Sequence, residues 1–235
     1  MNDFFFKVDI ALETRVIAGS NYLNQYTANL VRNSDLEVVG KVNFLRLDVE
    51  SILSETGTCQ LVGAAASEYS EFTCAFDWLM ANSADDYSRF FSVKTRFHNS
   101  VENYCLEHKH AHRGNIIYIE ELKLSPRHIG KGLGRYLLKA ISNYFGSDDG
   151  VVTLQSCPLQ LCCHLSISKE YRYLGKSPES DRKKLLQWYK VNGFKQIEEN
   201  SHDWLFATTE DLNKLDVNPL TTFTLDRARS QKEVI

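Results

Sequence analysis

Long apolar stretches are absent from this chain. Nowhere in its 235 residues does a run approach the roughly 18 consecutive apolar residues of a membrane-spanning helix. The N-terminal sequence MNDFFFKVDIALETR contains neither a long apolar signal region nor a small-residue cleavage site. We therefore expect a soluble, cytoplasmic protein that does not bind membranes.

The sequence also lacks an excess of positive charge. Its 27 Lys and Arg residues and 30 Asp and Glu residues are spread along the chain, with a formal net charge of −3. This composition excludes a broad positive field of the kind that attracts nucleic acids or anionic lipids. We expect no nucleic-acid partner.

Metal-ligand spacings are missing as well. None of the six cysteines lies in a C-x-x-C motif, so we interpret them as reduced thiols. His108, His110 and His112 stand at alternate positions, but only the distant 162–164 segment, Cys-Cys-His, could add ligands. We interpret the histidine segment as a polar connection and expect no metal.

The hydrophobic periodicity predicts an α/β domain over residues 1–216, followed by a tail or arm over 217–235. Apolar runs and alternation predict strands over 4–12, 37–48, 115–124, 151–155, 194–197 and 203–207. Spacings of three and four predict helices over 61–79, 87–105, 133–145 and 182–192, the last capped by Ser180 or Asp181 and closed by Gly193. Segment 21–33 is ambiguous and we interpret it as a helix. Segment 49–106 is then a helical insertion.

The stretch SPRHIGKGLGRYLL, residues 125–138, places Gly130, Gly132 and Gly134 directly before the strongest helical stripe. The spacing excludes a Rossmann fingerprint, because the third glycine comes one residue early, and no P-loop string is present. The first turn of the following helix offers unpaired N–H groups that favour an anion, with Lys131 and Arg135 adding charge. The alternative is a helix entered through a tight turn.

Two motifs resemble the GNAT superfamily of acetyl-CoA-dependent N-acetyltransferases. LKLSPRHIGKGLGRYLL resembles its pyrophosphate loop, an apolar strand ending in proline followed by [QR]-x-x-G-x-[GA] and two leucine-like residues. Gly132 and Gly134 take the two small positions, and Ile129 stands where Gln or Arg is expected. LLQWYKVNGFKQI is similar to the [FY]-Y-x-x-x-G-F segment, with Tyr189 at the tyrosine position.

The resemblance covers residues 115–207 and implies a GNAT-like fold. It implies a mixed, twisted sheet of six to seven strands flanked by helices on both faces, with acetyl-CoA in a cleft where the central strands part. The acetyl carbonyl would then be held by backbone N–H groups of Leu122, Lys123 and Leu124. The phosphates would be held by Ile129, Gly130, Lys131, Gly132, Leu133, Gly134 and Arg135.

The same resemblance implies direct acetyl transfer to a primary amine of a small molecule or a protein. Tyr189 is the candidate acid for the leaving thiolate, and its alternative role is a packed aromatic residue. Glu120 or Glu121 is the candidate base, or a solvated carboxylate. Strand alternation places these two on opposite faces, with Glu120 beside Leu122 and Leu124. A nucleophilic role for Cys157 is disfavoured, because the superfamily generally transfers the acetyl group directly.

Two hypotheses therefore remain at this point. The chain is an acetyltransferase using acetyl-CoA, or a non-catalytic CoA-binding module that acts through a protein partner. Either form is compatible with a homodimer. The 49–106 insertion and the connection 156–180 are larger than a minimal domain of this kind needs, so we expect them to shape the acceptor site.

Overall fold

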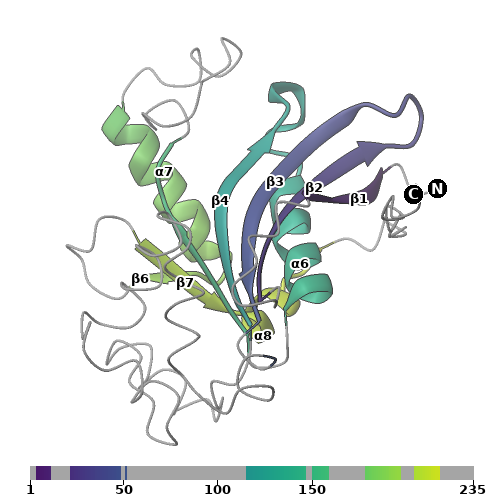
Figure 1. Ribbon diagram of the computed structural model, residues 1–235. Coiled ribbons are helices and arrows are strands. Elements are labelled where there is room, and N and C mark those ends of the chain that lie inside the picture. Colours follow the sequence, from purple (N-terminus) through teal and green to yellow (C-terminus); the bar gives the residue numbers. More distant parts are fainter. Residues whose placement is uncertain are drawn as a thin grey trace, which may run out of the picture.

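A computed structural model describes residues 4–11, 22–48, 51, 115–146, 150–158, 178–196 and 204–217 (Figure 1). The predicted helices 61–79 and 87–105 lie outside these residues, as do the histidine segment 108–112 and the tail beyond residue 217. Of the cysteines, Cys157 alone is described, and its Sγ donates to the Pro158 carbonyl at 3.7 Å.

Seven strands form one mixed, open sheet in the order β1-β2-β3-β4-β5-β7-β6. The strands are β1 (Phe4–Ala11), β2 (Leu23–Arg32), β3 (Val38–Leu47), β4 (Ile116–Leu124), β5 (Val151–Gln155), β6 (Lys195–Gln196) and β7 (Trp204–Thr208). All neighbours are antiparallel except β4 and β5, which are parallel. The prediction of a mixed sheet of six to seven strands is confirmed.

Within the described ranges, three α-helices accompany the sheet: α6 (Leu133–Phe145), α7 (Pro178–Val191) and α8 (Thr209–Asn213). Their buried side chains join a single hydrophobic core on one face of the sheet. Figure 1 shows β4 between α6 and α7. Helices on the other face stay a prediction, because segment 49–106 lies outside the described residues. No helix in the described part is long and apolar enough to cross a membrane.

The predicted helix over 21–33 is wrong, because this segment forms β2. Leu23, Tyr26 and Leu30 are spaced by three and four residues, as on a helix. However, Tyr26, Ala28 and Leu30 are buried, whereas Gln25, Thr27 and Asn29 between them are half-buried, which is the period of a strand. Pairing with β1 on one side and β3 on the other decides the structure, since it satisfies backbone groups along both edges.

The core lies between the sheet and α6. The predicted stripe of α6 is confirmed at Tyr136, Leu137, Ala140 and Ile141, which are buried. They pack with residues of the two parallel strands, namely Ile117, Ile119, Val152 and Leu154. At the end of α6, Arg46 Nε donates to the Phe145 carbonyl at 3.1 Å and anchors the helix to β3.

Helix α7 begins earlier than predicted and ends where predicted. It begins at Pro178, so Ser180 and Asp181 lie in its first turn rather than at its cap. Proline suits this first position because its fixed φ is helical and an N–H there has no helical acceptor. At the other end Gly193 has φ +90°, and the Phe194 N–H donates to the Tyr189 carbonyl at 3.1 Å.

Candidate functional site between β4, β5 and the glycine loop

The two parallel strands part halfway along β4. Their pairing runs from Ile116–Val151 to Ile119–Leu154 and then stops, although β4 continues to Leu124. Over the described residues, the part of β4 beyond Ile119 therefore has a neighbouring strand on one side only, which is β3. Figure 1 shows β4 and the β6–β7 pair diverging from the end of the sheet near α8. Leu122, Lys123 and Leu124, the predicted carbonyl-binding segment, lie on this parted stretch.

The glycine loop, residues 125–134, directly follows the part of β4 that has separated from β5. The Ser125 N–H donates to the Val39 carbonyl at 2.8 Å, which holds the loop entrance against β3. A 3-10 turn η1 (Pro126–His128) and an extended Ile129 follow. Gly130 has φ +81°, and Gly132, the N-cap residue of α6, has φ +79°. Both therefore adopt left-handed backbone conformations that favour glycine.

The start of α6 suits an anion. No side chain caps its first turn, and that turn carries no acidic residue. The first N–H groups of a helix have no intrahelical acceptor and lie at the positive end of its dipole. Lys131 and Arg135 are exposed beside them. Ile129 is also exposed, so the side chain that departs from the pattern leaves this surface open rather than blocking it.

Trp188 joins α7 to the glycine loop. A Cβ placed on Gly134 would lie 2.8 Å from Cζ2 of Trp188, so the absence of a side chain at Gly134 lets the two helices approach closely. The next residue, Tyr189, is buried, with ring centroids 4.9 Å from Trp188 and 5.3 Å from Phe194. The structure therefore brings the two motifs of the sequence together.

The Tyr189 phenol lies in the core on the α6 side of the sheet. Its burial raises the pKa of Tyr189 well above the ordinary value of a tyrosine. The hydroxyl therefore keeps its proton at every physiological pH. This state permits hydrogen-bond donation, whereas complete proton transfer from it would be unfavourable.

A β-bulge moves Glu120 to the face opposite the predicted one. Asn43 of β3 pairs with Glu121 while the next residue, Phe44, pairs with Ile119, so Glu120 is an extra residue. Leu122 and Leu124 consequently pack on the core side with Ile117 and Ile119. The prediction that Glu120 shares a face with Leu122 and Leu124 is wrong.

Both carboxylates lie on the face opposite α6, which overturns their predicted separation. Gln25 Nε2 donates to Glu120 Oε2 at 3.2 Å, and Asn43 Nδ2 donates to Glu121 Oε2 at 2.9 Å. Gln25 and Asn43 share that face, since Thr27, two residues from Gln25, pairs with Asn43. Glu121 also forms an ion pair with Lys123, with 2.5 Å between Oε1 and Nζ.

Burial reveals two further polar residues near the motifs. Ser156, directly after β5, and Asn192, directly after α7, are both buried, and Ser156 Oγ and Asn192 Oδ1 have no hydrogen-bond partner in the part of the chain that the structure describes. The sequence offers one signal for Ser156, its position at the end of a predicted strand. Nothing in the sequence indicates its burial or the lack of a partner.

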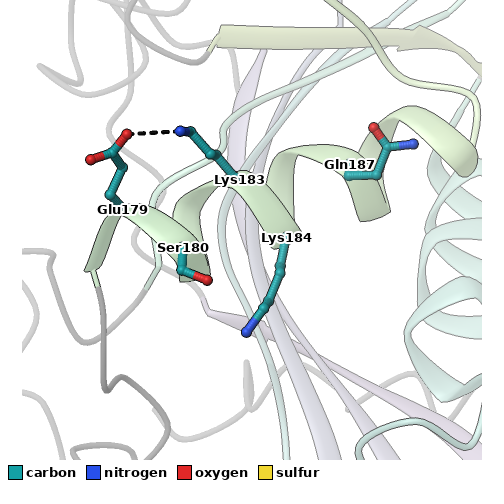
Figure 2. A pocket seen from close by; sticks show the side chains of 5 residues that line it. All are labelled: Glu179, Ser180, Lys183, Lys184 and Gln187. Carbon is teal, nitrogen blue, oxygen red and sulfur yellow. Dashed lines mark ion pairs between the residues drawn. The ribbon is translucent and has the colours of Figure 1, made fainter.

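A surface hollow of about 660 Å³ lies beside α7 (Figure 2). Its described lining residues all come from that helix, namely Glu179, Ser180, Lys183, Lys184 and Gln187. Lys183, Lys184 and Gln187 lie three, four and seven residues after Ser180, so the four share one helical face. Tyr189 lies about half a turn away from that face, so the hollow is separate from the motif residues.

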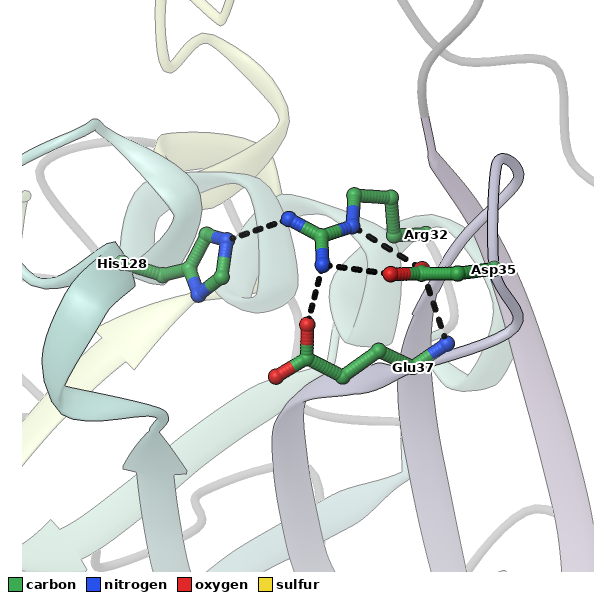
Figure 3. A network of polar contacts seen from close by, with 4 residues as sticks. All are labelled: Arg32, Asp35, Glu37 and His128. Carbon is green, nitrogen blue, oxygen red and sulfur yellow. Dashed lines mark hydrogen bonds and ion pairs between the residues drawn. The ribbon is translucent and has the colours of Figure 1, made fainter.

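His128 connects the glycine loop to the β2–β3 hairpin (Figure 3). Its Nε2 lies 3.5 Å from Nη1 of Arg32, whose guanidinium also contacts the carboxylates of Asp35 and Glu37. Burial lowers the pKa of His128, and the cations Lys131 and Arg32 lower it further. The imidazole is therefore neutral at pH 7. Among the described residues, no three His, Cys, Asp or Glu side chains gather as metal ligands.

Comparisons with models of protein families, with curated proteins and with solved structures found no match for this chain.

Proposed function

We propose that the chain is an N-acetyltransferase that moves an acetyl group from acetyl-CoA to a primary amine. The observation that carries the proposal is the parting of β4 and β5 directly before the uncapped glycine entrance to α6. A gap between strands exposes backbone donors to an extended ligand, and the helix start suits phosphates. One ligand class with both features is an acyl thioester on a nucleotide-bearing arm.

In this proposal the phosphates bind the N–H groups of Ile129, Gly130, Lys131, Gly132, Leu133, Gly134 and Arg135. The cationic side chains of this segment add attraction from exposed positions, where salt screens it. The backbone of Leu122, Lys123 and Leu124 receives the acetyl carbonyl. Acetyl-CoA supplies the activated thioester, whose C–S bond breaks as the new C–N bond forms.

The two sides of the sheet then have different tasks. Tyr189, on the α6 side, donates a hydrogen bond to the departing thiolate. Glu120, on the opposite side, takes the proton that the attacking amine loses, directly or through water. We assign this task to Glu120 because it is partly exposed, whereas Glu121 is buried. Glu121 is the positioning residue.

The test of the proposal begins with acetyl-CoA itself. We expect it to raise the thermal midpoint of the purified protein and to release CoA thiol when amines of several classes are supplied. Gly132→Asp, which puts a carboxylate at the helix start, should abolish the thermal shift. A wild-type protein that shows no thermal shift with acetyl-CoA contradicts the proposal.

Tyr189→Phe tests the catalytic part. We expect it to bind acetyl-CoA with unchanged affinity and to lose turnover by about 100-fold, the lower end of acid–base contributions. Tyr144→Phe is the control, because Tyr144 is a partly exposed tyrosine of α6 outside the proposed site. Equal turnover in both variants would remove Tyr189 from the mechanism. Cofactor binding without any turnover would favour the CoA-binding module instead.

A further inference from the structure

Ser156 is a buried hydroxyl at the point where the two parallel strands part. It follows Gln155, the last residue of β5, and comes two residues after Leu154, the last β5 residue paired with β4. The core beside this point contains Val152 and Leu154 of β5 and also Tyr189. Its side chain is completely buried.

Among the described residues, the hydroxyl of Ser156 has no hydrogen-bond partner. Two other buried hydroxyls of this part of the fold are satisfied. Thr153 Oγ1, on β5, donates to the Leu205 carbonyl at 3.0 Å, and Ser142 Oγ donates to the Thr209 carbonyl at 2.9 Å. A buried hydroxyl without a partner destabilises a fold by about 1–3 kcal/mol, so native proteins rarely retain one without a use.

We propose that Ser156 Oγ–H donates to a carbonyl oxygen of the acyl-CoA arm in the gap between β4 and β5. This inference rests on the proposed function and adds a residue that neither motif contains. Beyond Leu154 the chain no longer has β4 beside it, and there the ligand takes the place of the neighbouring strand. The arm has two kinds of carbonyl, the amides of pantetheine and the thioester, and both accept from a hydroxyl.

The experiment compares Ser156→Ala with Thr153→Val. Removing an unsatisfied hydroxyl should leave the thermal midpoint of the unliganded protein unchanged or raise it. Thr153→Val should lower that midpoint, because it leaves the Leu205 carbonyl without its side-chain donor. The effects on the ligand should be the reverse. Ser156→Ala should reduce either acetyl-CoA affinity or turnover, whereas Thr153→Val should leave acetyl-CoA affinity unchanged.

The kinetic constants separate the two carbonyls. A pantetheine contact predicts a 3- to 10-fold weaker Kd for both CoA and acetyl-CoA in Ser156→Ala, with kcat unchanged. A thioester contact predicts unchanged affinity for CoA and a kcat lowered by a similar or larger factor. Ser156→Cys, nearly the same in size with a weaker donor, should fall between wild type and Ser156→Ala.

Two results would overturn the inference. If Ser156→Ala lowers the unliganded midpoint as Thr153→Val does and leaves Kd and kcat unchanged, the hydroxyl has a structural partner and no ligand role. In that case the wild type still binds acetyl-CoA, and the proposed function stands. If the wild type itself binds no acetyl-CoA, the proposed function fails and this inference fails with it.

Discussion

His128 is a buried residue whose charge state links pH to the stability of the glycine loop. Its Nε2 faces the Arg32 guanidinium, and its other nitrogen, Nδ1, has no hydrogen-bond partner among the residues that the structure describes. Asp35 is the main compensating group of this network, and its hydrogen bonds with Arg32 lower the pKa of the Asp35 carboxyl to about 2. Arg127, Lys131 and Glu37 are the remaining charges that act on His128.

The lowered pKa of His128 predicts a loss of stability in mild acid. Above its ordinary value of 6.5 the imidazole is neutral in both folded and unfolded chains. Below 6.5 the unfolded chain takes up the proton first, so the free energy of unfolding falls as pH falls. We expect the thermal midpoint of the wild type to drop more between pH 7.5 and 5.5 than that of His128→Gln. Comparing the two drops cancels any fixed effect of the substitution, and parallel drops would contradict the prediction.

Also at the residue scale, the sequence indicated the motif residues, but it did not indicate their contacts or hydrogen-bond partners. Tyr189 and Gly134 come from separate motifs, and the structure joins them through Trp188. The burial of Tyr189 follows from the apolar stripe of α7, but the lack of a partner at Ser156 does not follow from any local pattern. Satisfaction of a hydroxyl depends on neighbours distant in sequence, such as Leu205 for Thr153.

At the scale of elements, the limits of β4 were predictable and the face of Glu120 was not. The run of apolar residues indicates the strand, but the bulge arises from register with β3 and leaves no mark in the composition around Glu120. The alternation beyond that residue still holds, with Leu122 and Leu124 on one face and Glu121 and Lys123 on the other, but Glu120 joins the face of Glu121. The error at β2 has a related cause, because short segments fit both helical and strand spacing until pairing decides.

The contact between α6 and α7 predicts that Gly134 tolerates no side chain. Gly134→Ala places a methyl group against the Trp188 ring and should lower the free energy of unfolding in urea by about 1–3 kcal/mol. Trp188→Leu in the same chain should relieve most of this added cost. Gly132→Ala is the control, since its strain comes from a φ of +79° and no atom lies within 4 Å of the added carbon. If the effects of Gly134→Ala and Trp188→Leu are additive, the added methyl group and the ring do not interact, which would contradict the prediction.

At the scale of the whole molecule, the sheet consists of two parts that meet at one seam. Strands β1 to β4 form an antiparallel part, β5, β7 and β6 form the other, and the β4–β5 pairing joins them. Side chains of α6 reinforce the seam: Ser142 bonds to Thr209 and Lys139 Nζ donates to the Leu215 carbonyl at 2.7 Å. The sequence indicated every strand of the two parts except β2, but their order depends on pairings between segments far apart in the chain.

The seam predicts that both parts of the sheet unfold together. Ile117 and Val152 are neighbours across it, and both side chains are completely buried. Ile117→Ala removes three carbons from the core and should lower the free energy of unfolding by about 2–5 kcal/mol. The exposed Val38 provides the control, because Val38→Ala should change stability by less than about 0.5 kcal/mol. We expect far-UV circular dichroism, to which β1–β4 contribute most strand residues, and the fluorescence of Trp204 in β7 to shift together in Ile117→Ala. Trp78→Phe and Trp188→Phe in the same chain leave Trp204 as the tryptophan that is measured. Separate transitions would mean that the β5–β7–β6 part unfolds independently of β1–β4.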